Sequence, residues 1–148
     1  MVNIIIFLSL VINAQQPTLS TQSYTLEHSV YDANFTEKVI AYFLNPDNCS
    51  SNILSNDIEK SKIWEFKRLG FYRTELIFAL KFCCEKNIDI DTVLIKINKN
   101  KKSIFEIAKE YNYNVIENFN RSKEIKEKIE KELDNKDLIK VLIDKYFK

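Results

Sequence analysis

The sequence predicts an all-α protein, a small bundle of about five or six short helices that follows a cleaved signal peptide. Glycine occurs once, at Gly70, and proline only twice, at Pro17 and Pro46, so the turn residues that all-β folds need are scarce. Most of the remaining chain carries apolar residues at the three- and four-residue spacing of helices that bury one face.

The first 14 residues have the pattern of a signal peptide. An apolar stretch from Ile4 to Ile12 is followed by the small residue Ala14, which suits signal peptidase, although no Lys or Arg precedes the stretch. An uncleaved anchor is the alternative, but the stretch is shorter than the roughly 20 apolar residues that span a bilayer. We therefore expect an exported protein, periplasmic or secreted, with no stable membrane insertion after cleavage.

Composition divides the rest of the chain into two parts. Residues 15–30 are rich in Gln, Ser and Thr and predict a flexible leader. Residues 31–148 predict a single helical domain, which is long enough to bury a core without metals or disulfides. With 22 basic and 21 acidic residues the net charge is +1, so no general field attracts polyanions.

The first predicted helix covers residues 36–44. Thr36 is its candidate N-cap, and it stops before Pro46, which disfavours helix at the preceding residue. The segment is short and very apolar, so a strand is the alternative. Residues 46–55 are polar and predict a loop.

Two helices follow this loop. Asn56 can cap a helix over residues 56–68, which Gly70 ends as the residue best able to adopt a left-handed turn. The next helix, opened by Thr74 and running to residue 84, is apolar on almost every side and is broken only by Lys81. A helix of this kind is expected at the centre of the bundle.

The next two helices are short and close together. Asp91 is the predicted cap of a helix that runs to Ile97, and the Asn- and Lys-rich residues 98–102 predict a turn. Ser103 and Glu106 then match a capping box, which predicts a well-defined start for a helix over residues 103–111.

The C-terminal part of the chain predicts a pair of helices. Residues 121–133 carry a thin apolar stripe among Lys and Glu, and residues 137–147 have a wide apolar face. Residues 121–147 are therefore the candidate interaction surface for a protein partner. The interpretation that we favour is that this face packs onto residues 74–84, because most amphipathic helices complete their own core.

The chain has three cysteines, Cys49, Cys83 and Cys84. Cys83 and Cys84 are neighbours in a predicted helix, where their side chains point about 100° apart and a bond between them would be strained. A bridge from Cys49 to either of them suits an oxidising compartment. Three buried thiols that act as small apolar residues are the alternative.

Two motifs in the middle of the chain are Leu69-Gly-Phe-Tyr-Arg-Thr-Glu-Leu-Ile-Phe-Ala-Leu80 and Lys102-Ser-Ile-Phe-Glu-Ile-Ala-Lys-Glu-Tyr111. With them, residues 39–115 resemble a group of small exported helical proteins of bacteria that lack an assigned function. The first motif is similar to that group's Leu-Gly-aromatic stretch before a Glu-containing apolar helix. The second is similar to its aromatic-x-Glu-Ile-Ala-Lys segment. The resemblance implies an all-helical periplasmic or secreted protein and no activity.

Few residues suggest catalysis or metal binding. The only histidine, His28, lies in the predicted leader, which argues against Ser-His or Cys-His catalysis. Glu106 and Glu110 are one helical turn apart, but two carboxylates without a third ligand are typical of a helix surface. Glu75 lies in the first turn of the most apolar helix. An enzyme could use a buried acid at this position. The simpler interpretation is a first-turn acid that the helix dipole favours.

Nucleic-acid binding is the second function class that we consider. The helices over 91–97 and 103–111 look like a helix-turn-helix, and Lys99, Lys101 and Lys102 would suit phosphate. The near-zero net charge, the scarcity of Arg and the export signal oppose this reading.

We therefore expect an exported, non-catalytic binding or structural module of the bacterial envelope. No catalytic, cofactor-binding or metal-binding residue is assigned, and no nucleic-acid partner is expected. The alternative is a cytoplasmic helix-turn-helix-like nucleic-acid-binding or regulatory protein. Asn34, Asn48 and Asn120 fit the N-glycosylation pattern, which matters only in a eukaryote.

Overall fold

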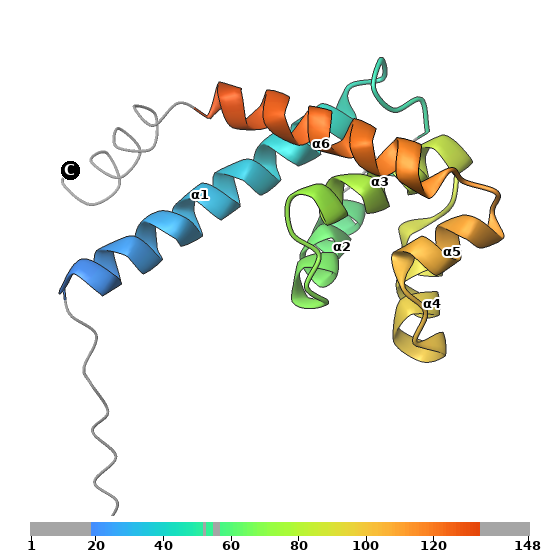
Figure 1. Cartoon of the computed structure of the whole chain (residues 1–148), viewed down its shortest axis with the longest axis horizontal. Helices are drawn as coiled ribbons and strands as arrows, with labels where there is room; N and C mark the ends of the chain where they lie inside the picture. The colour runs from blue at the N-terminus through green and yellow to red at the C-terminus, as the bar shows by residue number, and fades with distance from the viewer. Residues whose placement is uncertain (1–18, 52, 55–56, 134–148) are drawn as a thin grey trace, which may run out of the picture.

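The computed structural model describes residues 19–51, 53–54 and 57–133, with side chains from residue 30 onward except residues 52 and 55–60. This part of the chain contains six helices and no strand, which confirms the predicted all-α class (Figure 1). The helices are α1 (Leu19–Leu44), α2 (Asp57–Arg68), α3 (Thr74–Lys86), α4 (Ile90–Asn100), α5 (Ile104–Glu110) and α6 (Val115–Glu132).

Helix α1 is much longer than predicted. It begins at Leu19, so the prediction of a flexible leader is wrong for residues 19–30, while residues 15–18 lie outside the described residues. Phe35, Val39 and Phe43 recur every four residues and are buried, which fixes the C-terminal half of the helix. A helix that is already nucleated gains one hydrogen bond for each added residue, and residues 19–30 contain no Gly or Pro to stop it.

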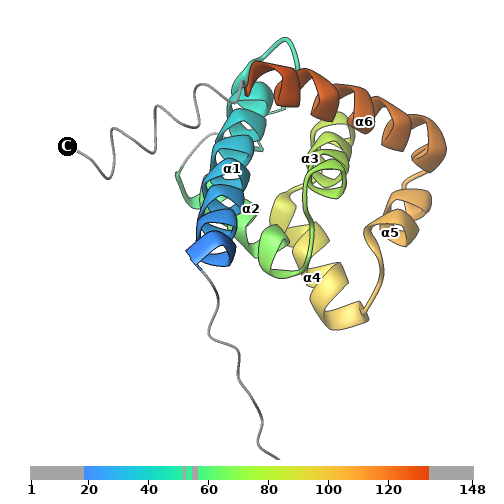
Figure 2. The ribbon, with the colours of Figure 1, turned by 60° about the vertical axis from the view of Figure 1, so that its left-hand side comes forward.

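Helix α3 is the centre of the bundle, as predicted. Every side chain from residue 76 to residue 84 is buried, including that of Lys81. Helix α6 crosses over α3 and the C-terminal half of α1, and its contacts with α3 are the most extensive between any two helices of the described chain (Figure 2). The described part of the predicted surface 121–147 therefore packs onto α3, and residues 134–148 lie outside the described residues.

An aromatic cluster fills the space between α3 and the helices that follow it. The Phe78 ring lies 5.2 Å from Phe105, 5.8 Å from Tyr113 and 6.1 Å from Phe119, measured between ring centroids. Phe82 continues the cluster towards Tyr111 and Tyr113. Aromatic pairs at these separations stabilise a core beyond the area they bury.

Two helix boundaries differ from the prediction. Asp89, and not Asp91, caps α4, because the helix must include the buried Ile90; Asp91 then pairs with Lys62 of α2. Helix α4 also continues through Asn100 and ends where Lys101 adopts a left-handed conformation, with φ of 54°. The predicted turn 98–102 is therefore shorter than expected.

Helix α6 begins at Val115, six positions before the predicted Arg121. The Asn114 carboxamide caps it, because its Oδ1 accepts a hydrogen bond of 3.2 Å from the Glu117 amide. The start is difficult to predict because several asparagines lie around this point. Asn has a low helix propensity but is among the best N-caps, so each of them could precede or begin the helix.

A disulfide bond joins Cys49 to Cys84, with 5.7 Å between their Cα atoms. It connects the loop after α1 to the C-terminal turn of α3. Cys83 is the free thiol and is buried. Of the two pairings that the sequence left open, the structure has the one with Cys84. Among the described residues, no helix is both long enough and apolar enough to cross a membrane.

Candidate functional site

A groove of about 430 Å³ lies between α1 and the C-terminal end of α2. Trp64, Lys67 and Arg68 line it from α2, at the spacing that places three side chains on one face of a helix. Asp32 lines it from α1, and Tyr72 lines it from the turn between α2 and α3. We call these five residues the α1–α2 groove.

The turn after α2 places Tyr72 at the groove. Gly70 has φ of 89°, a left-handed conformation that favours glycine, as the sequence predicts. The chain then reverses, so that the Phe71 amide donates a 3.0 Å hydrogen bond to the carbonyl of Phe66. The Phe71 ring packs on Phe66 with 5.4 Å between centroids, which leaves Tyr72 on the outside.

Lys67 is the buried cation at the base of the groove. Only 8% of this residue is exposed. Its ammonium donates a hydrogen bond to the Asp32 carboxylate and one of 2.8 Å to Thr36 Oγ1. The Thr36 hydroxyl in turn donates a 2.7 Å hydrogen bond to the Asp32 carbonyl. The charge of Lys67 is therefore compensated, as a buried lysine requires.

Two aromatic rings flank this ammonium. The Lys67 Nζ lies 5.0 Å from the centroid of Trp64 and 5.9 Å from that of Tyr72. Both rings remain open to solvent, with 42% of Trp64 and 52% of Tyr72 exposed. Large aromatic side chains that are held in place yet stay exposed are typical of binding sites.

Arg68 gives the groove its excess positive charge. Its side chain is exposed and forms no ion pair with any residue in the described part of the chain. The groove thus combines two cations with one carboxylate. A planar guanidinium can donate two parallel hydrogen bonds to a carboxylate or phosphate, so the arrangement favours a small anion that also has an apolar face.

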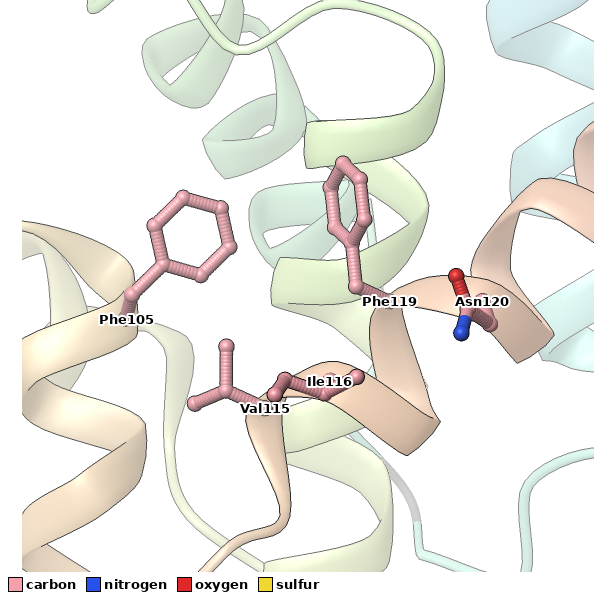
Figure 3. Close-up of a pocket in the computed structure, with 5 residues that line it drawn as sticks. All are labelled: Phe105, Val115, Ile116, Phe119 and Asn120. Carbon is pink, nitrogen blue, oxygen red and sulfur yellow. The ribbon is translucent and has the colours of Figure 1, made fainter.

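A second hollow, of about 220 Å³, lies where α6 begins. Phe105 approaches it from α5, whereas Val115, Ile116, Phe119 and Asn120 come from the first turns of α6 (Figure 3). Ile116 is the most exposed of these apolar side chains, at 78%. This hollow is apolar and offers a ligand only the Asn120 carboxamide as a polar side chain, so it gives less basis for recognition than the α1–α2 groove.

The acidic residues that the sequence singled out have structural roles. Glu106 and Ser103 form the predicted capping box, and the Ser103 amide and hydroxyl keep the pKa of Glu106 below its ordinary value. Glu110 accepts hydrogen bonds from Lys102 and Lys96, which lower its pKa. The described residues contain no group of three or more potential metal ligands.

The remaining candidates are scattered. Glu75 is exposed in the first turn of α3, so the structure contradicts a buried acid at this position. His28 is part of α1, but its side chain lies outside the described residues. Lys99 and Lys101 are exposed at the end of α4, whereas Lys102 is held by Glu110. Of the glycosylation-like positions, Asn48 and Asn120 are exposed and Asn34 is half-buried.

The α1–α2 groove was not among the sequence-based candidates. Its signal is the spacing of Trp64, Lys67 and Arg68, together with an aromatic pair after Gly70. That spacing alone is common on helix surfaces, and the carboxylate that completes the groove comes from 32 positions before Trp64 in the chain. Comparison with models of protein families, with curated proteins and with solved structures finds no match for this chain.

Proposed function

We propose that this protein is an exported, non-catalytic binding module of the bacterial envelope that binds a small anionic ligand in the α1–α2 groove. The observation that carries this proposal is the buried ammonium of Lys67 between two exposed aromatic rings. The guanidinium of Arg68 lies beside it, forms no ion pair with a described residue, and supplies the charge that attracts an anion.

Two features support export. The first 14 residues have the apolar stretch and small cleavage-site residue of a signal peptide, although they lie outside the described part of the structure. The disulfide between Cys49 and Cys84 fits the same destination, because disulfides persist in the periplasm and outside the cell and are rare in the cytosol.

Binding is favoured over catalysis by the state of the groove's polar groups. The Asp32 carboxylate is already paired with Lys67 and compensates the charge of that buried ammonium. Trp64 and Tyr72 offer ring faces, and Arg68 offers a permanent charge. These groups can hold and orient a ligand without taking part in a reaction.

Export is tested by the intact mass of the protein recovered from the periplasm or medium of an expressing bacterium. We expect loss of residues 1–14 and a mass two hydrogens lower than that of the reduced chain. A chain that retains Met1 and is recovered from the cytosol would overturn the export proposal and favour the helix-turn-helix alternative. Binding to DNA that weakens steeply with added salt would then be the next observation to seek.

Binding is tested by titrating the purified protein with a panel of small carboxylates and phosphate monoesters. Trp64 is the only tryptophan, so its fluorescence reports directly on the groove. We expect at least one anion to change this fluorescence, and Arg68→Gln to weaken its binding roughly tenfold. Arg121→Gln, which removes the same charge from the exposed surface of α6, is the matched control. A panel without any response would overturn the proposal.

A further inference from the structure

We infer that the ligand of the α1–α2 groove is an acidic sugar, a hydroxylated ring that carries one carboxylate. This inference rests on the proposed function and adds the chemical class of the ligand. It follows from three properties of the groove: its charge, its two ring faces and its free hydrogen-bond acceptor.

The charge of the groove matches one negative charge. Lys67 and Arg68 are positive and Asp32 is negative, so one positive charge remains without a partner among the described residues. A single carboxylate on the ligand neutralises it through two parallel hydrogen bonds from Arg68. A nucleotide with two or more charges would leave excess negative charge beside Asp32, which weakens its binding.

The ring faces of Trp64 and Tyr72 fit a ligand that is ring-shaped. Each ring lies beside the ammonium of Lys67, and both residues remain exposed, so a flat group can cover the open part of either ring. The C–H face of a sugar ring is apolar, and packing it on an aromatic ring removes apolar surface of both from water. A volume of about 430 Å³ accommodates one or two such rings.

The free acceptor in the groove favours a hydroxylated ligand. One oxygen of the Asp32 carboxylate accepts the hydrogen bond from Lys67, and the other accepts none from the residues that the structure describes. A sugar hydroxyl can donate to this second oxygen, whereas an aromatic acid such as benzoate has no hydroxyl to offer. Leaving a carboxylate oxygen without a donor beneath a bound ligand costs free energy, so the groove discriminates against benzoate.

Three matched probes test the inference through Trp64 fluorescence and calorimetry: D-galacturonate, D-galactose and benzoate. Galactose has the same ring and hydroxyls without the carboxylate, and benzoate has a ring and a carboxylate without hydroxyls. We expect galacturonate to bind roughly tenfold more tightly than either control. Arg68→Gln should remove the preference for galacturonate over galactose. Tyr72→Ala should weaken the binding of all three probes. Arg121→Gln should change neither the preference nor the affinities.

The outcomes separate the ligand class from the groove itself. Equal binding of galactose and galacturonate, or equal binding of benzoate and galacturonate, would overturn the acidic-sugar inference. If galacturonate fails but a phosphate monoester binds in an Arg68-dependent way, the groove is a binding site and the ligand class is wrong. If no anion binds to a folded protein, both the inference and the proposed binding function fail.

Discussion

Two lysines are buried in the part of the chain that the structure describes, and they have nearly the same partners but very different surroundings. Lys67 is 8% exposed and Lys81 is 7% exposed. Each ammonium pairs with one carboxylate, Asp32 or Glu85, and donates a second hydrogen bond to a neutral oxygen. That oxygen belongs to Thr36 for Lys67 and to Asn118 for Lys81, at 2.8 Å and 3.1 Å.

The two lysines differ in their aromatic neighbours. The Tyr113 ring, 6.0 Å from Lys81, is buried, and its hydroxyl donates a 2.6 Å hydrogen bond to Glu85. Burial raises the pKa of Tyr113, and the Glu85 carboxylate raises it further. The ring beside Lys81 is therefore covered, and its network ties α3 to the start of α6. The rings beside Lys67 face solvent, so the same set of partners there is open to a ligand.

The first way to test this contrast is to remove a ring from each region. Phe78→Ala deletes a fully buried side chain that contacts three aromatic rings near Lys81, and we expect a loss of about 3–5 kcal/mol in the free energy of unfolding. Trp64→Ala in the groove should cost no more than about 1 kcal/mol, because this residue is 42% exposed. Urea denaturation followed by circular dichroism measures both losses. Similar losses would contradict the contrast between the surroundings of Lys67 and those of Lys81.

The second test replaces each lysine with methionine. Lys81→Met leaves the buried Asn118 oxygen without a donor, so we expect a loss of about 2 kcal/mol. Lys67→Met should cost about 1 kcal/mol, because the Thr36 hydroxyl keeps its bond to the Asp32 carbonyl and the Asp32 carboxylate can be hydrated. A larger loss for Lys67→Met in the same urea titration would mean that the groove is primarily structural.

The third test removes one hydroxyl from each region. Tyr113→Phe deletes the hydrogen bond to Glu85 and should lower the free energy of unfolding by about 1 kcal/mol. Tyr72→Phe removes an exposed hydroxyl that makes no hydrogen bond to a described residue, so a change within about 0.5 kcal/mol is expected. Thermal unfolding of the two variants compares them directly, and equal shifts would argue against a structural role for the Tyr113 hydroxyl.

The smallest effect concerns pH and the buried thiol next to the disulfide. Burial raises the pKa of Cys83 from 9.0 to about 12. As the pH rises, the unfolded chain therefore loses this proton before the folded chain does. The protonated thiol makes its full contribution to the free energy of unfolding below about pH 9, and this contribution is lost as the pH rises towards 12. Between about pH 8 and 9.5 we expect a loss of somewhat under 1 kcal/mol.

Cys83→Ala isolates this contribution. The other titrating groups are common to both proteins, so the variant's free energy of unfolding should decline less steeply with pH over the same interval. Urea titrations at the two pH values provide the measurement. If the free energy of unfolding changes equally with pH in the two proteins, Cys83 is accessible to solvent.

The fold was predictable where the determining signal is local. The capping box of Ser103 and Glu106 lies within four consecutive residues, and the Glu106 carboxylate accepts a 2.7 Å hydrogen bond from the Ser103 amide as expected. Gly70 ends α2 through its own backbone conformation. The continuous apolar run of α3 also predicts its central position without knowledge of its neighbours.

The errors occur where packing overrides a local preference. Asp89 and Asp91 are equally good caps, and the burial of Ile90 between them selects Asp89. The groove was missed for a similar reason. Trp64 and Arg68 are ordinary surface residues of a helix until Asp32 and Tyr72 are placed beside them, and only the tertiary structure brings these four together.

The bond between Cys49 and Cys84 also affects how the protein would respond to proteases. The two residues are 35 positions apart, and α2 with its groove residues lies between them. A single proteolytic cut in this interval would leave two fragments joined through sulfur. The nicked chain would be heavier by one water molecule, and its halves would separate only after reduction. Trp64 and Arg68 would thus stay attached to a damaged molecule for as long as its surroundings remain oxidising.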